Sequence, residues 1–188
     1  MATMYKRKSR LRARQQSKLM EHFVVGSTVC ATAEVVGVQA NTAIRFFMHL
    51  RQLIASKLPS YRLCGEVEAD ESYFGGVRKG KRGRGAAGKV AVFGLLKRGG
   101  KVYTAITPNA KTETLLPILQ EKGEPDSIVY TDTFRAYNAL DVFDFHHRRI
   151  NHSKLFADNR NHINGIKNFW NLAKRHMRKY NGIKSDNF

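Results

Sequence analysis

The first 60 residues alternate polar and apolar positions with the period of a helix. Apolar residues recur at spacings of three and four over 17–25, 28–36 and 39–58, and each of the first two runs stops at a glycine. Pro59 follows the third run and cannot continue a helix. The sequence therefore predicts three helices in residues 1–60.

The last two of these helices are spaced like a helix-turn-helix. Ala33, Gly37 and Val38 stand where that motif has a small residue, a turn glycine and a buried aliphatic residue. The third helix would then recognise DNA, with Arg45 and Arg51 on its outer face. A plain three-helix bundle explains the same pattern, and the sequence leaves both interpretations open. The apolar residues predicted to face inward on the third helix are Ala43, Ile44, Phe47, Leu50 and Ile54.

From residue 61 onward the pattern changes to that of strands. Three runs rich in β-branched and aromatic residues lie at 66–73, 90–96 and 102–107, and residues 98–101 predict a hairpin turn between the last two. The remaining predicted elements are a helix at 112–122, a strand at 127–131, a helix at 134–140, a strand at 145–150 and a long helix at 159–180. Pro117 lies inside the first of these helices, so we expect a kink or a later start there.

These elements follow the order βββ-α-β-α-β-α, which is the order of a ribonuclease-H-like fold. Such an α/β fold has a mixed sheet with helices on both faces. We expect two domains, a helical DNA-binding region at 1–60 and a ribonuclease-H-like catalytic core at 61–188.

The composition adds a strong positive charge to this picture. Lys and Arg number 33 against 15 Asp and Glu, a formal net charge of +18, and 42% of the residues are hydrophobic. A folded and strongly cationic chain indicates a nucleic-acid partner, because neutralising phosphates releases counterions.

Several classes of protein are excluded by the same composition. No apolar run reaches the roughly 18 residues of a membrane span, and no secretory h-region follows the charged N-terminus. With only Cys30 and Cys64, a disulfide framework and a four-cysteine zinc site are both excluded. We therefore expect a cytoplasmic protein that makes no use of a membrane or of a small-molecule cofactor.

One acidic cluster interrupts the basic chain. Glu66, Glu68, Asp70 and Glu71 lie within six residues, and Asp132 follows a predicted strand. In the predicted fold the strands that carry Asp70 and Asp132 are neighbours, which would bring the two carboxylates together. Paired carboxylates suit Mg²⁺ or Mn²⁺, and two ions about 3.5–4 Å apart can activate the attacking oxygen and stabilise the leaving oxygen in phosphoryl transfer.

Three stretches of the chain resemble a known family. They are the nine residues from Glu68-Ala69-Asp70-Glu71 to Gly76, then Tyr130-Thr131-Asp132 with Tyr137, and then Asn161 to Trp170 followed by Lys174 and Arg175. Together they resemble the bacterial insertion-sequence transposases, which have a helical DNA-binding N-terminus and a ribonuclease-H-like "DDE" core. The resemblance covers essentially the whole chain. It implies terminal inverted repeats and target DNA as partners, a divalent metal, and an oligomer on DNA.

The resemblance also implies roles for individual residues. It assigns Asp70 and Asp132 to the first two metal-binding positions and Lys174 to orienting phosphate. The third position in the family is a Glu on the last helix, where this chain has Lys167. Since an ammonium group repels divalent cations, either Asn164 on the same helix face supplies the third group or this copy is impaired. Family members also continue further than Phe188, which together with Lys167 indicates a decayed or truncated element as the alternative to an active one.

The basic residues predicted to contact DNA come from three segments. In addition to Arg45 and Arg51, they are Arg78, Lys79, Lys81, Arg82 and Arg84 in a glycine-rich loop and Lys174, Arg175 and Arg178 on the last helix. The leading hypothesis is a transposase that hydrolyses a phosphodiester and joins the freed 3′-OH to target DNA. The alternatives are a remnant that only binds the terminal repeats, and a nuclease on the same fold.

Overall fold

A computed structural model describes residues 11–58, 60–75, 89–132, 145–150 and 162–180 of the chain. The chain divides into two units, residues 1–60 and residues 61–188. Among the described residues, no helix has the length and apolar character needed to cross a membrane.

The first unit contains the three predicted helices. They are α1 (Ala13–Val25), α2 (Val29–Val36) and α3 (Ala40–Lys57). Gly26 and Gly37 end the first two helices in the left-handed conformation, with φ of 75° and 70°, which glycine adopts without steric cost. The buried core of this unit is formed by Leu19, Ala33, Ala43 and Phe47.

The apolar face of α3 is narrower than its sequence predicts. Ala43 and Phe47 are buried as expected, whereas Ile44 and Ile54 are 44% and 50% exposed. The prediction that these two isoleucines face inward is therefore wrong. The physical reasons differ: Ile44 lies about 100° around the helix from Ala43, beside the stripe that packs on α1 and α2, whereas Ile54 belongs to residues 51–58, which are all exposed.

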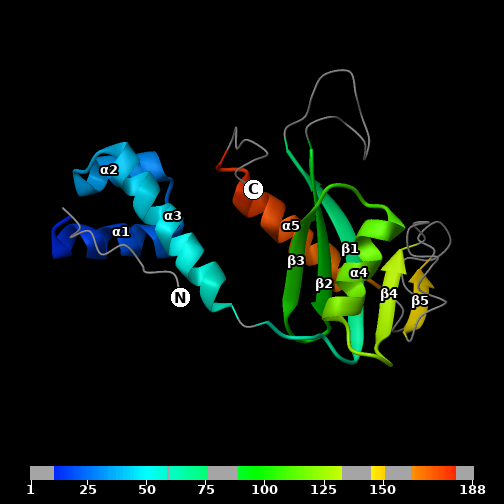
Figure 1. Ribbon diagram of the computed structural model, residues 1–188. Helices are drawn as coiled ribbons and strands as arrows, with labels where there is room; N and C mark the ends of the chain where they lie inside the picture. Colours follow the sequence, from blue (N-terminus) through cyan, green and yellow to red (C-terminus); the bar gives the residue numbers. More distant parts are fainter. Residues whose placement is uncertain (1–10, 59, 76–88, 133–144, 151–161, 181–188) are drawn as a thin grey trace, which may run out of the picture. The chain divides into compact units, whose positions relative to one another are not determined.

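The second unit is built on a five-stranded mixed sheet in the order β3-β2-β1-β4-β5 (Figure 1). The strands β1, β2 and β3 pair antiparallel, while β4 lies parallel to β1 and β5 lies parallel to β4. This strand order confirms the ribonuclease-H-like fold. The predicted helix at 134–140 lies outside the described residues. The strands are β1 (Glu66–Phe74), β2 (Val90–Lys97), β3 (Val102–Thr107), β4 (Ile128–Asp132) and β5 (His146–Ile150).

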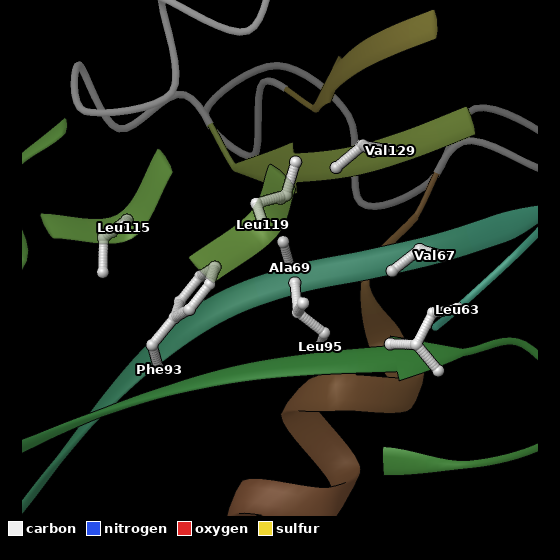
Figure 2. Close-up of a cluster of buried hydrophobic side chains, with 8 residues drawn as sticks. All are labelled: Leu63, Val67, Ala69, Phe93, Leu95, Leu115, Leu119 and Val129. Atoms are coloured by element: carbon white, nitrogen blue, oxygen red, sulfur yellow. The ribbon is translucent and has the colours of Figure 1, made fainter. Parts of the chain in front are cut away.

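Helices cover both faces of this sheet. On one face, α4 (Thr112–Lys122) buries Leu115 and Leu119 against Val67 and Ala69 of β1 (Figure 2). On the other face, α5 (Asn164–Met177) lies along β1 and β2 (Figure 1). Successive side chains of a strand point to opposite faces, so the residues of β1 that alternate with Val67 and Ala69 point toward α5.

Two predicted helices differ in detail from the structure. The helix α4 begins at Thr112 and continues through Pro117, although proline removes one helical hydrogen bond. Its two leucines are buried in the sheet core, and this packing holds the helix together across the proline. The last helix begins at Asn164, after non-helical residues 162–163, and the predicted start at 159 lies outside the described residues.

The contact between α5 and the sheet depends on two glycines. A Cβ on Gly94 of β2 would lie 2.4 Å from the Trp170 ring, and a Cβ on Gly165 of α5 would lie 2.5 Å from the Leu96 side chain. Trp170 is 5% exposed and belongs to the core beneath α5, so it is a packing residue. The helix is therefore seated at one position on the sheet.

The first prediction concerns this seating. We expect Gly94→Ala to lower the free energy of unfolding of residues 61–188 by about 1–3 kcal/mol, because the new methyl group overlaps a buried ring. The control is Gly100→Ala, whose Cβ would meet Lys97 atoms at 3.6 Å, an ordinary contact. Urea unfolding followed by fluorescence of Trp170, the only tryptophan of the chain, measures both variants. Equal stability of the two variants would contradict the close packing.

Candidate active site

Asp70 and Asp132 come from neighbouring parallel strands. The pairs Glu66↔Ile128 and Glu68↔Tyr130 join β1 to β4 at a constant offset. Continuing that offset by two residues places Asp132 beside Asp70, just beyond the paired stretch. Because side chains alternate along a strand, Asp70 lies on the same face as Glu68, which is the face covered by α5.

Asp70 is a buried carboxyl group with a strongly shifted pKa. It is 9% exposed, and its pKa is raised from 3.8 to about 7, mainly by burial and then by repulsion from Glu71 and Asp132. The ammonium of Lys167 acts in the opposite direction and lowers the pKa of Asp70. These interactions mean that Asp132 and Lys167 both lie within electrostatic range of Asp70. Asp132, which is 62 positions away in the sequence, and Lys167, on the last helix, are thus both near Asp70 in the folded chain.

The polar side of α5 carries the other residues singled out in this helix. Lys167 is half-buried, whereas Asn164, at the first position of the helix, is exposed. Lys174 and Arg178 are exposed further along α5, and the Lys174 ammonium lies 5.8 Å from the ring centroid of Phe74, the last residue of β1. The residue of α5 that interacts with Asp70 is therefore the cation Lys167, and the amide of Asn164 lies one helical turn before it.

The other residues predicted to contact DNA are distributed over both units. Arg45 and Arg51 are exposed on α3, and the Arg51 guanidinium lies 5.5 Å from the ring centroid of Phe23. Arg175 is exposed on α5. The five basic residues of the glycine-rich loop lie outside the described residues: Arg78, Lys79, Lys81, Arg82 and Arg84.

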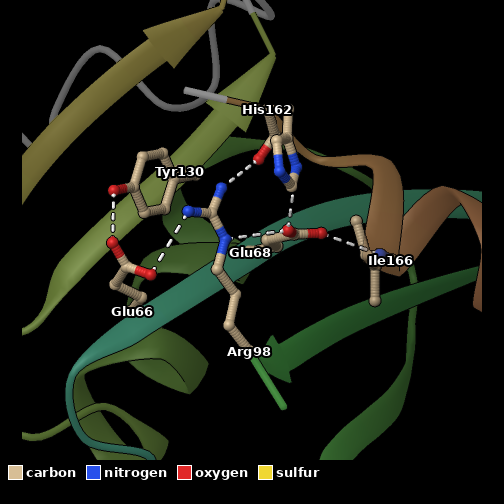
Figure 3. Close-up of polar contacts among 6 residues, drawn as sticks. All are labelled: Glu66, Glu68, Arg98, Tyr130, His162 and Ile166. Carbon is tan, nitrogen blue, oxygen red and sulfur yellow. Dashed lines mark hydrogen bonds and ion pairs between the residues drawn. The ribbon is translucent and has the colours of Figure 1, made fainter. Parts of the chain in front are cut away.

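The acidic cluster does not act as one group. Glu66 and Glu68 bind Arg98, at 3.3 Å and 3.0 Å (Figure 3). Glu71 points to the face opposite Asp70, because side chains alternate along the strand. Asp70, in contrast, interacts electrostatically with both Asp132 and Lys167. The sequence shows the cluster but gives no signal that Arg98, a residue of a hairpin turn, is the partner of two of its members.

Sequence reasoning also missed two other residues on this face. Tyr130 lies under Arg98, with its ring centroid 3.8 Å from the guanidinium carbon, and its hydroxyl donates to Glu66 at 3.0 Å. Burial and this hydrogen bond raise the pKa of Tyr130, so its hydroxyl remains a donor. Arg148 on β5 pairs with Tyr130 in register and is exposed, which adds a positive charge on the face that carries Asp132. An alternation count across the parallel strands would have found Arg148.

The described residues contain no group of three or more His, Cys, Asp or Glu placed to hold a metal ion. Asp70 and Asp132 nevertheless provide two carboxylates close to each other, and Asn164 provides an exposed amide at the first position of α5. This set provides two negative charges, against one positive charge from Lys167.

Comparison with known proteins identifies the class and then the family. The strand order, with helices on both faces, makes residues 61–188 a ribonuclease-H-like α/β unit. Residues 62–187, well over half of the chain, match the family model of the ISXO2-like transposase domain. The chain belongs to this family of insertion-sequence transposases.

Two relatives come from bacterial and archaeal sources. A transposase-like protein of Haemophilus influenzae is 64% identical over 88 residues, which cover 47% of this chain and 72% of the relative. A protein in the transposable element ISH50 of Halobacterium salinarum is 32% identical over 154 residues, which cover 72% of this chain. That second alignment spans 52% of the relative, so this chain matches about half of its length.

A solved structure of a transposase complex is also similar. The match is to the Mos1 strand transfer complex, with 17% identity and a TM-score of 0.29, over 77% of this chain and 59% of the other.

The second prediction follows from the pKa of Asp70. Because the folded protein binds a proton that the unfolded chain releases above about pH 4, the free energy of unfolding falls between about pH 4 and pH 7, by up to about 4 kcal/mol for this group. In metal-free buffer, Asp70→Asn should therefore be more stable than the wild type at pH 8, and this difference should shrink toward pH 4. Urea unfolding of both proteins at about pH 4.5, 6 and 8 measures the difference in their free energies of unfolding.

The control for this experiment is Glu113→Gln, which removes an exposed carboxylate on α4. Its stability relative to the wild type should change little with pH over the same range. If Asp70→Asn shows the same flat profile, Asp70 is not the repelled and buried carboxyl described above.

Proposed function

We propose that this protein is a DNA transposase that cleaves phosphodiester bonds at the ends of an insertion sequence and transfers the freed 3′-OH to target DNA. The observation that carries the proposal is the juxtaposition of Asp70 and Asp132 on one face of a ribonuclease-H-like sheet, within a chain of net charge +18. A basic chain attracts phosphates, while paired carboxylates beside the phosphate require a cation between them.

The pair of aspartates fits a hard divalent cation, Mg²⁺ or Mn²⁺. The raised pKa of Asp70 reflects burial and repulsion between carboxylates, and a bound cation would relieve both by favouring the ionised form. Asp70 and Asp132 would hold the metal, with Asn164 as the third oxygen donor. When bound, the metal supplies activation of the attacking oxygen and stabilisation of the leaving oxygen.

The remaining residues act on the DNA. Lys174 and Arg178 project from the exposed side of α5 and bind phosphates next to the aspartates, so Lys174 orients the scissile strand. In the first unit, α2 and α3 act as a helix-turn-helix, and Arg45 on the exposed face of α3 reads the terminal inverted repeats. Two element ends are joined in one reaction, so the active form on DNA is an oligomer.

A third prediction tests the reaction itself. Purified protein with Mg²⁺ should cleave and transfer terminal-repeat DNA, and Asp70→Ala and Asp132→Ala should each abolish the products, since each removes a metal ligand. The control is Glu113→Ala, which removes a carboxylate from the opposite side of the sheet and should leave the reaction unchanged. Undiminished strand transfer by Asp70→Ala would overturn the assignment of the site.

Lys167 favours a second candidate function. An ammonium group that interacts with Asp70 reduces the attraction of the site for a divalent cation. A copy with a weakened metal site would still bind the terminal repeats through its basic surfaces. In this alternative the protein is a catalytically impaired remnant that occupies the repeats as a DNA-binding protein.

The fourth prediction separates the two candidates. Lys167→Glu should raise the affinity for Mg²⁺ and switch on or increase cleavage, because it replaces a repelling charge with a ligand. Lys167→Gln is the matched control, which removes the positive charge and adds no carboxylate. If the wild type is inert and Lys167→Glu cleaves DNA, the protein is the catalytically impaired remnant. If the wild type already cleaves, Asn164→Ala should abolish the reaction. If that variant still cleaves as the wild type does, Asn164 is not the third ligand.

A further inference from the structure

The geometry points to Glu68 and Arg98 as positioning residues of the site. We propose that Arg98 holds the Glu68 carboxylate so that it fixes the first turn of α5 on β1, and that this contact sets where the third site position of α5 lies relative to Asp70. The proposal rests on the proposed function because it takes α5 to carry that third position. Figure 3 shows the six residues involved.

The first turn of α5 has a cap that comes from another element. Its N-cap residue is Ile163, whose apolar side chain makes no capping hydrogen bond. Instead the backbone N–H of Ile166 donates to Glu68 Oε2 of β1 at 2.8 Å. A carboxylate at a helix N-terminus satisfies an open N–H group and interacts favourably with the helix dipole. A residue of the strand therefore performs the task of the missing cap.

Arg98 holds this carboxylate in place and joins it to two further elements. Its Nε donates to Glu68 Oε1 at 3.0 Å, and its Nη2 donates to the backbone oxygen of His162 at 2.6 Å, just before α5. Its guanidinium also covers the ring of Tyr130 on β4. One side chain thus connects β1, β4 and the start of α5, which are the three elements that carry the site.

The close packing around the contact leaves α5 little freedom to shift. A Cβ on Gly165 would lie 2.9 Å from Glu68 Oε2, so the helix backbone approaches the carboxylate directly. Along the helix, Lys167 follows Ile166 immediately. Along the strand, Asp70 is the next residue after Glu68 on the same face. A displacement at the Glu68–Ile166 contact would therefore be transmitted to the neighbouring pair Asp70 and Lys167.

Glu68 is suited to positioning and not to metal binding. It is 1% exposed, and both of its carboxylate oxygens accept hydrogen bonds, one from Arg98 and one from Ile166. These bonds direct both oxygens toward the protein, to Arg98 and to the first turn of α5. Within the first acidic motif, Asp70 therefore belongs to the site itself, while Glu68, two residues earlier, holds the first turn of α5 in position.

Hydrogen exchange tests the contact without any need for activity. In Glu68→Ala we expect the Ile166 amide to lose protection by about tenfold or more, while amides of the β2–β3 hairpin keep theirs. Glu68→Gln should rescue part of the protection, because its side-chain oxygen still accepts the N–H. Glu66 is the more exposed carboxylate partner of Arg98. In Glu66→Gln the Ile166 amide should therefore lose less protection than in Glu68→Ala. An equal loss of protection over the whole sheet, or an unchanged Ile166 amide, would overturn the proposal.

A kinetic measurement tests the effect on the site. In whichever form cleaves DNA, the wild type or Lys167→Glu, adding Glu68→Ala should lower kcat by about tenfold or more and leave KM for DNA unchanged, because DNA-binding side chains are retained while the site geometry is not. An effect on KM alone would overturn the positioning role. If neither form cleaves DNA, the proposed function fails, and the hydrogen-exchange result still decides whether Glu68 docks α5.

Discussion

The parallel pairing of β1 with β4 is the constraint on which the rest of the site depends. It fixes the register of two segments that are distant in the chain, and it leaves Asp70 and Asp132 beside each other where the pairing stops. On the other side of β1 the sheet continues with the antiparallel strands β2 and β3, and beyond β4 it continues with the parallel strand β5. The cost of the arrangement is visible in Asp70, whose pKa is raised to about 7 by burial and by neighbouring carboxylates.

The position of α5 is the second constraint, and it has opposite electrostatic effects on the two proposed tasks, which are phosphate binding and metal binding. The helix is seated by Trp170 over Gly94 and by its first turn over Glu68. This seating presents its basic side next to the aspartates, which favours phosphate binding. The same seating brings the ammonium of Lys167 to Asp70, which disfavours a divalent cation. In the proposed function, the balance between these two effects decides whether the protein cuts DNA or only binds it.

Local sequence patterns were sufficient to predict the order of the described strands and helices. The hairpin of β2 and β3 followed from its turn residues, and the closeness of Asp70 to Asp132 followed from the order of the strands. The patterns failed where distant contacts decide the outcome. The periodicity places Ile44 and Ile54 on the apolar face of α3, but Ile44 lies beside the buried stripe and Ile54 lies in the exposed last turns of the helix. The tie between Arg98 and Glu68 joins segments 30 residues apart, and no local periodicity indicates such a pair.

A double-mutant cycle on the two aspartates tests the central claim most directly. Asp70→Asn, Asp132→Asn and the double variant would be unfolded in urea at pH 8 without metal. If the carboxylates lie side by side, each single change relieves the same repulsion, and the double variant gains less stability than the sum of the two, by about 1 kcal/mol or more. Additive effects, within about 0.5 kcal/mol, would show that the two side chains do not meet and that this sheet edge holds no paired site.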